Sequence, residues 1–252
     1  MKYLLSISLY LLSIAARADV VTVAVASNFV PVFENISSRF ESQSLHEVRQ
    51  VAGASGKLYA QILRGAPFDL FLSADHVKPR NLIEAGLAQK ASLATYAIGQ
   101  LALWSNVDNA EQWKHLPADK LIASEEFDRL AIANPAIAPY GSAAKHVLSS
   151  LGLFDDLKPT LIVGENVSQV FHFLHSKNAE LGFVSRAQVM SLANAHRGTF
   201  WPIPEKLHPA IRQDMVLLTR TESAAAVALH NYLQSREVRA MIIAAGYIGA
   251  DN

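Results

Sequence analysis

The chain has 252 residues, of which 51% are hydrophobic, and its 22 basic side chains balance its 22 acidic ones. This balance excludes the basic excess that marks a nucleic-acid-binding surface, so no nucleic-acid partner is expected. The length allows one large domain or two small ones. Cysteine is absent, so the hydrophobic core must stabilise the fold without disulfides.

The first 18 residues have the pattern of an export signal. One lysine precedes an apolar run at positions 3–16, and a small-x-small cleavage pattern follows, ending at Ala18. The run is too short to span a bilayer comfortably. We expect 1–18 to be a signal peptide that is cleaved after Ala18; a buried N-terminal helix is the alternative. With no cysteine to carry a lipid anchor, the mature protein is expected to be free in the periplasm.

The rest of the chain alternates between strand-like and helix-like segments. β-branched residues dominate the predicted strands, and apolar residues recur three and four positions apart in the predicted helices. This alternation predicts βαβ units with parallel strands, and the lack of a low-complexity linker favours two lobes joined by short segments. The expected strands are 20–26, 47–52, 69–73, 101–105, 129–133, 160–163, 181–184 and 214–220, and the expected helices are 29–40, 58–65, 79–85, 142–151, 168–175 and 222–233.

Four strand-to-helix junctions carry serine or asparagine where a helix is expected to begin. A helix N-terminus presents unpaired backbone N–H groups at the positive end of the helix dipole, and several such termini together can hold an anion. Serine and asparagine are also preferred N-caps, so capping alone is the alternative at each junction. The junctions are AVASNF with Ser27 and Asn28, GASGKL with Ser55, the segment 139–142 (PYGS) and the segment 166–168 (NVS).

GASGKL also resembles the end of a nucleotide-binding P-loop. That motif requires a glycine five residues before Gly56 and a hydroxyl residue directly after Lys57. The chain has Val51 and Leu58 at these positions. ATP binding is therefore not expected, and Lys57 is interpreted as a solvated residue in the first turn of a helix.

Enzymatic and metal sites have weaker support. Ser27 and Ser55 lack a recognisable base, and no G-x-S-x-G elbow surrounds Ser27. An exported hydrolase that uses Ser27 or Ser55 is therefore an alternative function that no catalytic motif in the sequence supports. His172 and His175 stand three residues apart on one predicted helix, but no third ligand lies at metal-binding spacing beside them. We expect neither catalysis nor direct metal ligands.

Seven stretches resemble one protein family, in order and over nearly the whole chain after residue 18. On these motifs the chain is similar to the periplasmic molybdate-binding proteins of ABC transporters, the ModA family. The resemblance implies a type II periplasmic binding protein fold, in which two α/β lobes close on a ligand. Residues 19–98 and 219–252 would form the first lobe, and 99–218 the second. The stretches are VAVASNF, GASGKLYAQILRGAPFDLFLSAD, TYAIGQLALWS, LAIANPAIAPYGSAAKHVL, VGENVSQVFHF, NAELGFVSRAQV and IRQDMVLL.

The resemblance also implies a function and a ligand set. The protein would capture molybdate, and also tungstate, and deliver it to the membrane permease of an ABC transporter, as a monomer without a cofactor. A different oxyanion or small organic anion is the alternative. The metal would be contacted only through its oxygen atoms, with Tyr140 and Val167 donating backbone N–H groups. The implied ligands are Ser27, Asn28, Ser55, Tyr140 and Val167.

Two further positions bear on this site. Many family members have a tyrosine after the LG-x-V strand, where this chain has the shorter Ser185, so Ser185 is left out of the ligand set. Glu165 lies beside the fourth junction and is interpreted as pointing outward, because a carboxylate inside the site would repel a dianion. An anion that only accepts hydrogen bonds is best held by donors alone.

Overall fold

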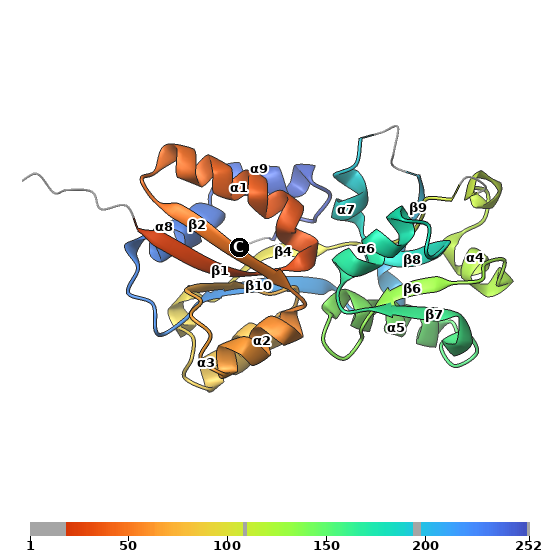
Figure 1. Ribbon diagram of the computed structural model, residues 1–252, viewed down its shortest axis with the longest axis horizontal. Helices are drawn as coiled ribbons and strands as arrows, with labels where there is room; N and C mark the ends of the chain where they lie inside the picture. Colours follow the sequence, from red (N-terminus) through yellow and green to blue (C-terminus); the bar gives the residue numbers. More distant parts are fainter. Residues whose placement is uncertain (1–18, 108–109, 194–197, 251–252) are drawn as a thin grey trace, which may run out of the picture.

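The computed structural model describes residues 19–107, 110–193 and 198–250. The predicted signal peptide, 1–18, lies outside the described residues. The chain forms two lobes side by side, each built around a five-stranded sheet with helices on it (Figure 1). In the described part of the chain, no helix combines the length and the apolar character needed to cross a membrane.

The sheet of the first lobe has the order β2-β1-β3-β10-β4. Successive residues of β1 point to opposite faces: Val21, Val23 and Val25 pack under α1, α8 and α9, and Ala24 packs on the side of α2 and α3 (Figure 1). The strands are β1 (Val20–Ala26), β2 (Glu47–Gly53), β3 (Leu70–Leu72), β4 (Ala94–Gly99) and β10 (Ile211–Leu217), and the helices are η1 (Ser27–Phe29), α1 (Val30–Gln43), α2 (Ser55–Leu63), α3 (Val77–Glu84), η2 (Lys90–Ser92), α8 (Ala224–Leu233) and α9 (Arg236–Ala244).

The sheet of the second lobe has the order β7-β6-β8-β5-β9. Trp104 of β5 is fully buried and stacks on Phe171 of the helix that covers this sheet. The strands are β5 (Leu101–Ser105), β6 (Leu130–Ala133), β7 (Leu161–Gly164), β8 (Leu181–Ser185) and β9 (Thr199–Pro202), and the helices are η3 (Ala110–Trp113), α4 (Ala118–Ser124), α5 (Pro139–Ser150), η4 (Lys158–Thr160), α6 (Val167–His175), α7 (Arg186–Met190) and η6 (Glu205–Leu207).

The structure confirms the predicted parallel strands in part and corrects one lobe boundary. β1 runs parallel to β2 and β3, and β6 runs parallel to β7 and β8. Both sheets are nevertheless mixed, because β10 runs antiparallel to β3 and β4, and β5 runs antiparallel to β8 and β9. Because β10 belongs to the first sheet, the chain returns to the first lobe before Ile211 and not after residue 218 as expected. An apolar strand has the same sequence pattern whichever sheet it joins, so this pattern could not assign β10 to a lobe.

Candidate functional site

All four predicted junctions meet at one small cavity between the lobes. Its empty volume is about 190 Å³, part of which is open to solvent. Each of the five expected ligand residues lines it, three from the first lobe and two from the second. The lining residues are Ala26, Ser27, Asn28, Gly53, Ala54, Ser55, Ala74, Ala138, Pro139, Tyr140, Asn166 and Val167.

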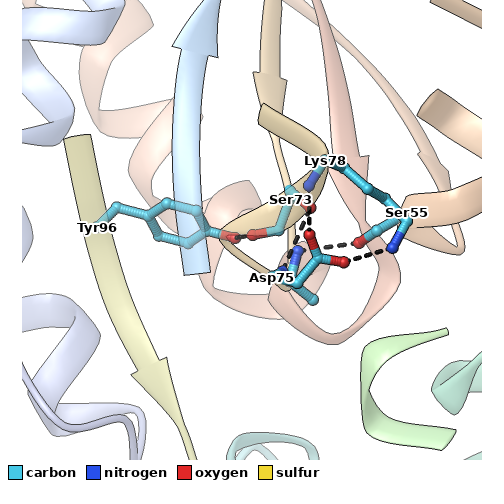
Figure 2. A network of polar contacts seen from close by, with 6 residues as sticks. Ser55, Ser73, Asp75, Lys78 and Tyr96 are labelled. Carbon is cyan, nitrogen blue, oxygen red and sulfur yellow. Dashed lines mark hydrogen bonds and ion pairs between the residues drawn. The ribbon is translucent and has the colours of Figure 1, made fainter. Parts of the chain in front are cut away.

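Ser55 holds its hydroxyl in a fixed orientation at the start of α2. The N-cap of α2 is Ala54, and no side-chain cap bond is made there. The Ser55 Oγ instead accepts a hydrogen bond from the backbone N–H of Ala74 at 2.9 Å (Figure 2). Ser55 is 1% exposed. A hydroxyl that accepts this bond keeps its proton for another acceptor. Ser55 can therefore donate into the cavity.

The loop that carries Ala74 is held by its own polar contacts. Tyr96 donates to the Ser73 carbonyl at 3.0 Å, and Asp75 accepts from the Lys78 backbone N–H at 2.9 Å. Both contacts are drawn in Figure 2. The Lys78 ammonium pairs with the same carboxylate at 2.5 Å. Asp75 is therefore neutralised within its own loop, and it is not among the residues that line the cavity.

Backbone groups supply further donors. Within the described residues, the N–H groups of Ser55, Tyr140 and Val167 donate to no protein acceptor, as expected for the first turn of a helix. A side-chain cap accounts for the polar residue at one of the four junctions, where Asn166 Oδ1 accepts the Gln169 N–H at 3.0 Å. This cap leaves the Val167 N–H free. The cavity therefore receives the positive ends of α2, α5 and α6.

The Asn28 side chain is engaged inside the protein. Its Nδ2 donates to Gln213 Oε1 at 2.9 Å and to the Tyr247 hydroxyl at 3.1 Å. Both amide protons are thus used, so Asn28 can offer only its main chain as a donor to a ligand. The Tyr247 hydroxyl in turn donates to the Asn28 carbonyl at 2.8 Å.

Gln213 joins the two lobes through Asn28 and Tyr140, which both line the cavity. It is fully buried on β10; its Oε1 accepts from Tyr96 at 3.1 Å and its Nε2 donates to the Tyr140 hydroxyl at 3.5 Å. Gly99, where the chain leaves β4, allows this approach, because a Cβ there would lie 2.3 Å from the Tyr140 hydroxyl. Gln213 is not among the residues predicted from the sequence; the signal for it is a Gln-Asp pair inside the apolar strand IRQDMVLL.

Burial keeps the hydroxyls of this network neutral. It raises the pKa of Tyr96, Tyr140 and Tyr247 above the ordinary tyrosine value. These groups therefore carry no charge near a bound anion at neutral pH.

Two positions left aside by the sequence analysis have definite roles. Ser185 is fully buried and donates to the Tyr140 hydroxyl at 3.2 Å, so it supports Tyr140 from outside the cavity lining. Glu165 does not simply point outward: its carboxylate pairs with Lys57 at 2.8 Å, across the cleft. The interpretation of Lys57 as merely solvated is therefore corrected. Its side chain is 52% exposed, but it contacts the opposite lobe.

The two histidines of α6 lie at the surface. His172 and His175 are both exposed, and His175 stacks on Phe171. Among the described residues, no group of three or more histidine, cysteine or acidic side chains could hold a metal ion.

Residues 21–248 match the family model described as bacterial extracellular solute-binding protein, and the chain belongs to this family. It is similar to two proteins named molybdate-binding protein ModA. The relative from Azotobacter vinelandii is 40% identical over 238 residues, covering 94% of this chain and 93% of the relative. The relative from Rhodobacter capsulatus is 38% identical over 238 residues, covering 94% and 91%.

The fold is similar to a solved structure of the periplasmic molybdate-binding protein of Azotobacter vinelandii. The TM-score is 0.85 at 35% identity, and the match covers 92% of this chain and 100% of that one. These findings confirm the expected two-lobe α/β fold and the family resemblance. They also confirm the expectation of a non-enzymatic solute-binding protein.

Proposed function

We propose that the protein captures molybdate, and tungstate as its chemical equivalent, in the cavity between the lobes and delivers it to the permease of an ABC transporter. The observation that carries this proposal is a small cavity between the lobes that receives neutral donors from both of them and no carboxylate. The names of the similar ModA proteins supply the identity of the anion.

The donor set suits a fully deprotonated oxyanion. Molybdate is a tetrahedral dianion whose oxygens only accept hydrogen bonds, and the cavity offers the hydroxyls of Ser27 and Ser55, the N–H groups of Ser55, Tyr140 and Val167 and the main chain of Asn28. Buried charge is tolerated when each oxygen is hydrogen-bonded. Hydrogen phosphate carries a proton that needs a hydrogen-bond acceptor. No carboxylate side chain lines the cavity to accept it. Sulfate shares the charge and shape of molybdate, so the size of the closed cavity must exclude it.

Thermal unfolding with different anions tests the ligand. We expect molybdate and tungstate to stabilise the mature protein, by about 2.7 kcal/mol when the anion is present at about a hundred times its Kd. Sulfate and phosphate at the same concentration should leave the unfolding temperature nearly unchanged. Stabilisation by sulfate or phosphate without any by molybdate or tungstate would contradict the proposed ligand and favour another oxyanion.

We further propose that the protein works as a free monomer in the periplasm after cleavage behind Ala18. The pattern of 1–18 supports export and cleavage, and the lack of cysteine supports a chain without a lipid anchor. Mass spectrometry of the protein exported by a Gram-negative host should give a chain that begins at Asp19, with no lipid attached, and size-exclusion chromatography with light scattering should give one copy. An uncleaved or lipidated chain would contradict the proposed route.

A further inference from the structure

The tip of GASGKL touches the second lobe directly. The Gly56 N–H at the start of α2 donates to the Ile137 carbonyl, in the loop before α5, at 2.8 Å. The Lys57–Glu165 ion pair and the hydrogen bond from Ser168 Oγ to the Ser27 carbonyl at 3.1 Å cross the same cleft. Three alanines of the first lobe pack into the hydrophobic cluster of the second, namely Ala26, Ala54 and Ala74. The structure therefore has the lobes closed on each other.

The contact at Gly56 leaves no room for a side chain. A Cβ at Gly56 would lie 2.8 Å from the Ile137 carbonyl oxygen and 2.9 Å from the Ile137 Cα. Both are backbone atoms, so no side-chain rotation could relieve the overlap. Gly56 is not among the glycines with positive φ, so its own conformation is open to alanine. The opposite lobe, and not the local backbone, is what requires glycine here.

We propose that Gly56 is a positioning residue for closure: its missing side chain lets the N-terminus of α2 approach the loop before α5. This proposal rests on the proposed function of the cavity. Ser55 precedes Gly56, and Tyr140 follows Ile137 by three residues. A block at Gly56–Ile137 therefore separates the donors of Ser55 and Tyr140, which must both reach hydrogen-bond distance of one small ion.

The Gly56→Ala variant separates closure from folding. We expect its Kd for molybdate, measured by isothermal titration calorimetry, to rise at least about tenfold, because overpacking at a tight contact is unfavourable. Its urea midpoint without molybdate should stay equal or rise, because alanine is the better helix residue. An unchanged Kd would overturn the proposal. A lowered midpoint would also contradict it, because Gly56 would then serve α2 itself.

Gly249→Ala is the matched control. A Cβ at Gly249 would meet the Ile243 Cδ1 at 3.0 Å and the Arg239 Nε at 3.2 Å, both atoms of flexible side chains of α9 in the same lobe. We expect this variant to bind molybdate as the parent does. If it were weakened as much as Gly56→Ala, the effect would not belong to the lobe contact, and the proposal would fail.

A distance measurement tests closure independently of the ligand's identity. The chain has no cysteine, so Leu63→Cys on α2 and Ser149→Cys on α5, both exposed positions, can carry spin labels on opposite lobes. Pulsed EPR with and without molybdate should show a short-distance population that Gly56→Ala reduces. Equal distance distributions in the two proteins would overturn the proposal. If the parent protein does not bind molybdate, the proposed ligand is wrong. The distances between the spin labels in the parent and in Gly56→Ala then test the role of Gly56 in closure by themselves.

Discussion

Replacing Ser55 with alanine should weaken molybdate binding by about 1–3 kcal/mol, roughly 5- to 150-fold in Kd. The substitution removes a hydroxyl that is buried at the cavity and oriented by the Ala74 N–H at 2.9 Å. It leaves one oxygen of the anion without that donor, and it also leaves the Ala74 N–H without its acceptor. Both consequences act against the closed, liganded protein. Titration calorimetry of the mature protein gives the Kd directly.

Lys57→Ala is the control for Ser55→Ala, because the two residues lie two positions apart on α2. Lys57 carries the only full positive charge in GASGKL, but its side chain is 52% exposed and pairs with Glu165 rather than lining the cavity. An exposed ion pair contributes about 0–1 kcal/mol, so the Kd should change less than about fivefold. A loss as large as that of Ser55→Ala would show that a cation, and not neutral donors, holds the anion.

The sequence predicted those parts of the fold that local patterns determine. Strand 20–26 coincides with β1, and the junction serines mark where α2 and α6 begin. The lobe of β10 could not be predicted, because pairing with β3 and β4 depends on residues far away in the chain. The same limit applies to β4 and β9, which carry weaker strand patterns and become strands by pairing with β10 and β5.

The site shows the same division between local and distant information. Capping and anion binding both place serine or asparagine before a helix, so the sequence left both open at each junction. Contacts seen only in the structure distinguish capping from a free donor at each junction. The hydroxyl of Ser55 contacts the backbone of Ala74, whereas Asn166 caps its own helix. The Lys57–Glu165 pair spans 108 positions, so no spacing rule could reveal it.

Replacing Gln213 with leucine should lower the free energy of unfolding by about 2–5 kcal/mol. Leucine is similar in size, so the main loss is polar: Gln213 accepts from Asn28 and Tyr96 and donates to Tyr140. The residue is fully buried, so water cannot replace these bonds, and each unsatisfied buried group costs about 1–3 kcal/mol. Urea unfolding without ligand measures the loss.

Gln50→Leu on the exposed edge strand β2 provides the control. Gln50 makes one side-chain hydrogen bond, to Glu34 at 3.2 Å in an exposed position, so its replacement should change stability by no more than about 0.5 kcal/mol. Gln213→Leu should also weaken molybdate binding, because the network positions Asn28 and Tyr140 on either side of the cavity. If Gln213→Leu proved as stable as Gln50→Leu, the network would not hold the lobes in register, and the positions of Asn28 and Tyr140 would have to be fixed by their backbone alone.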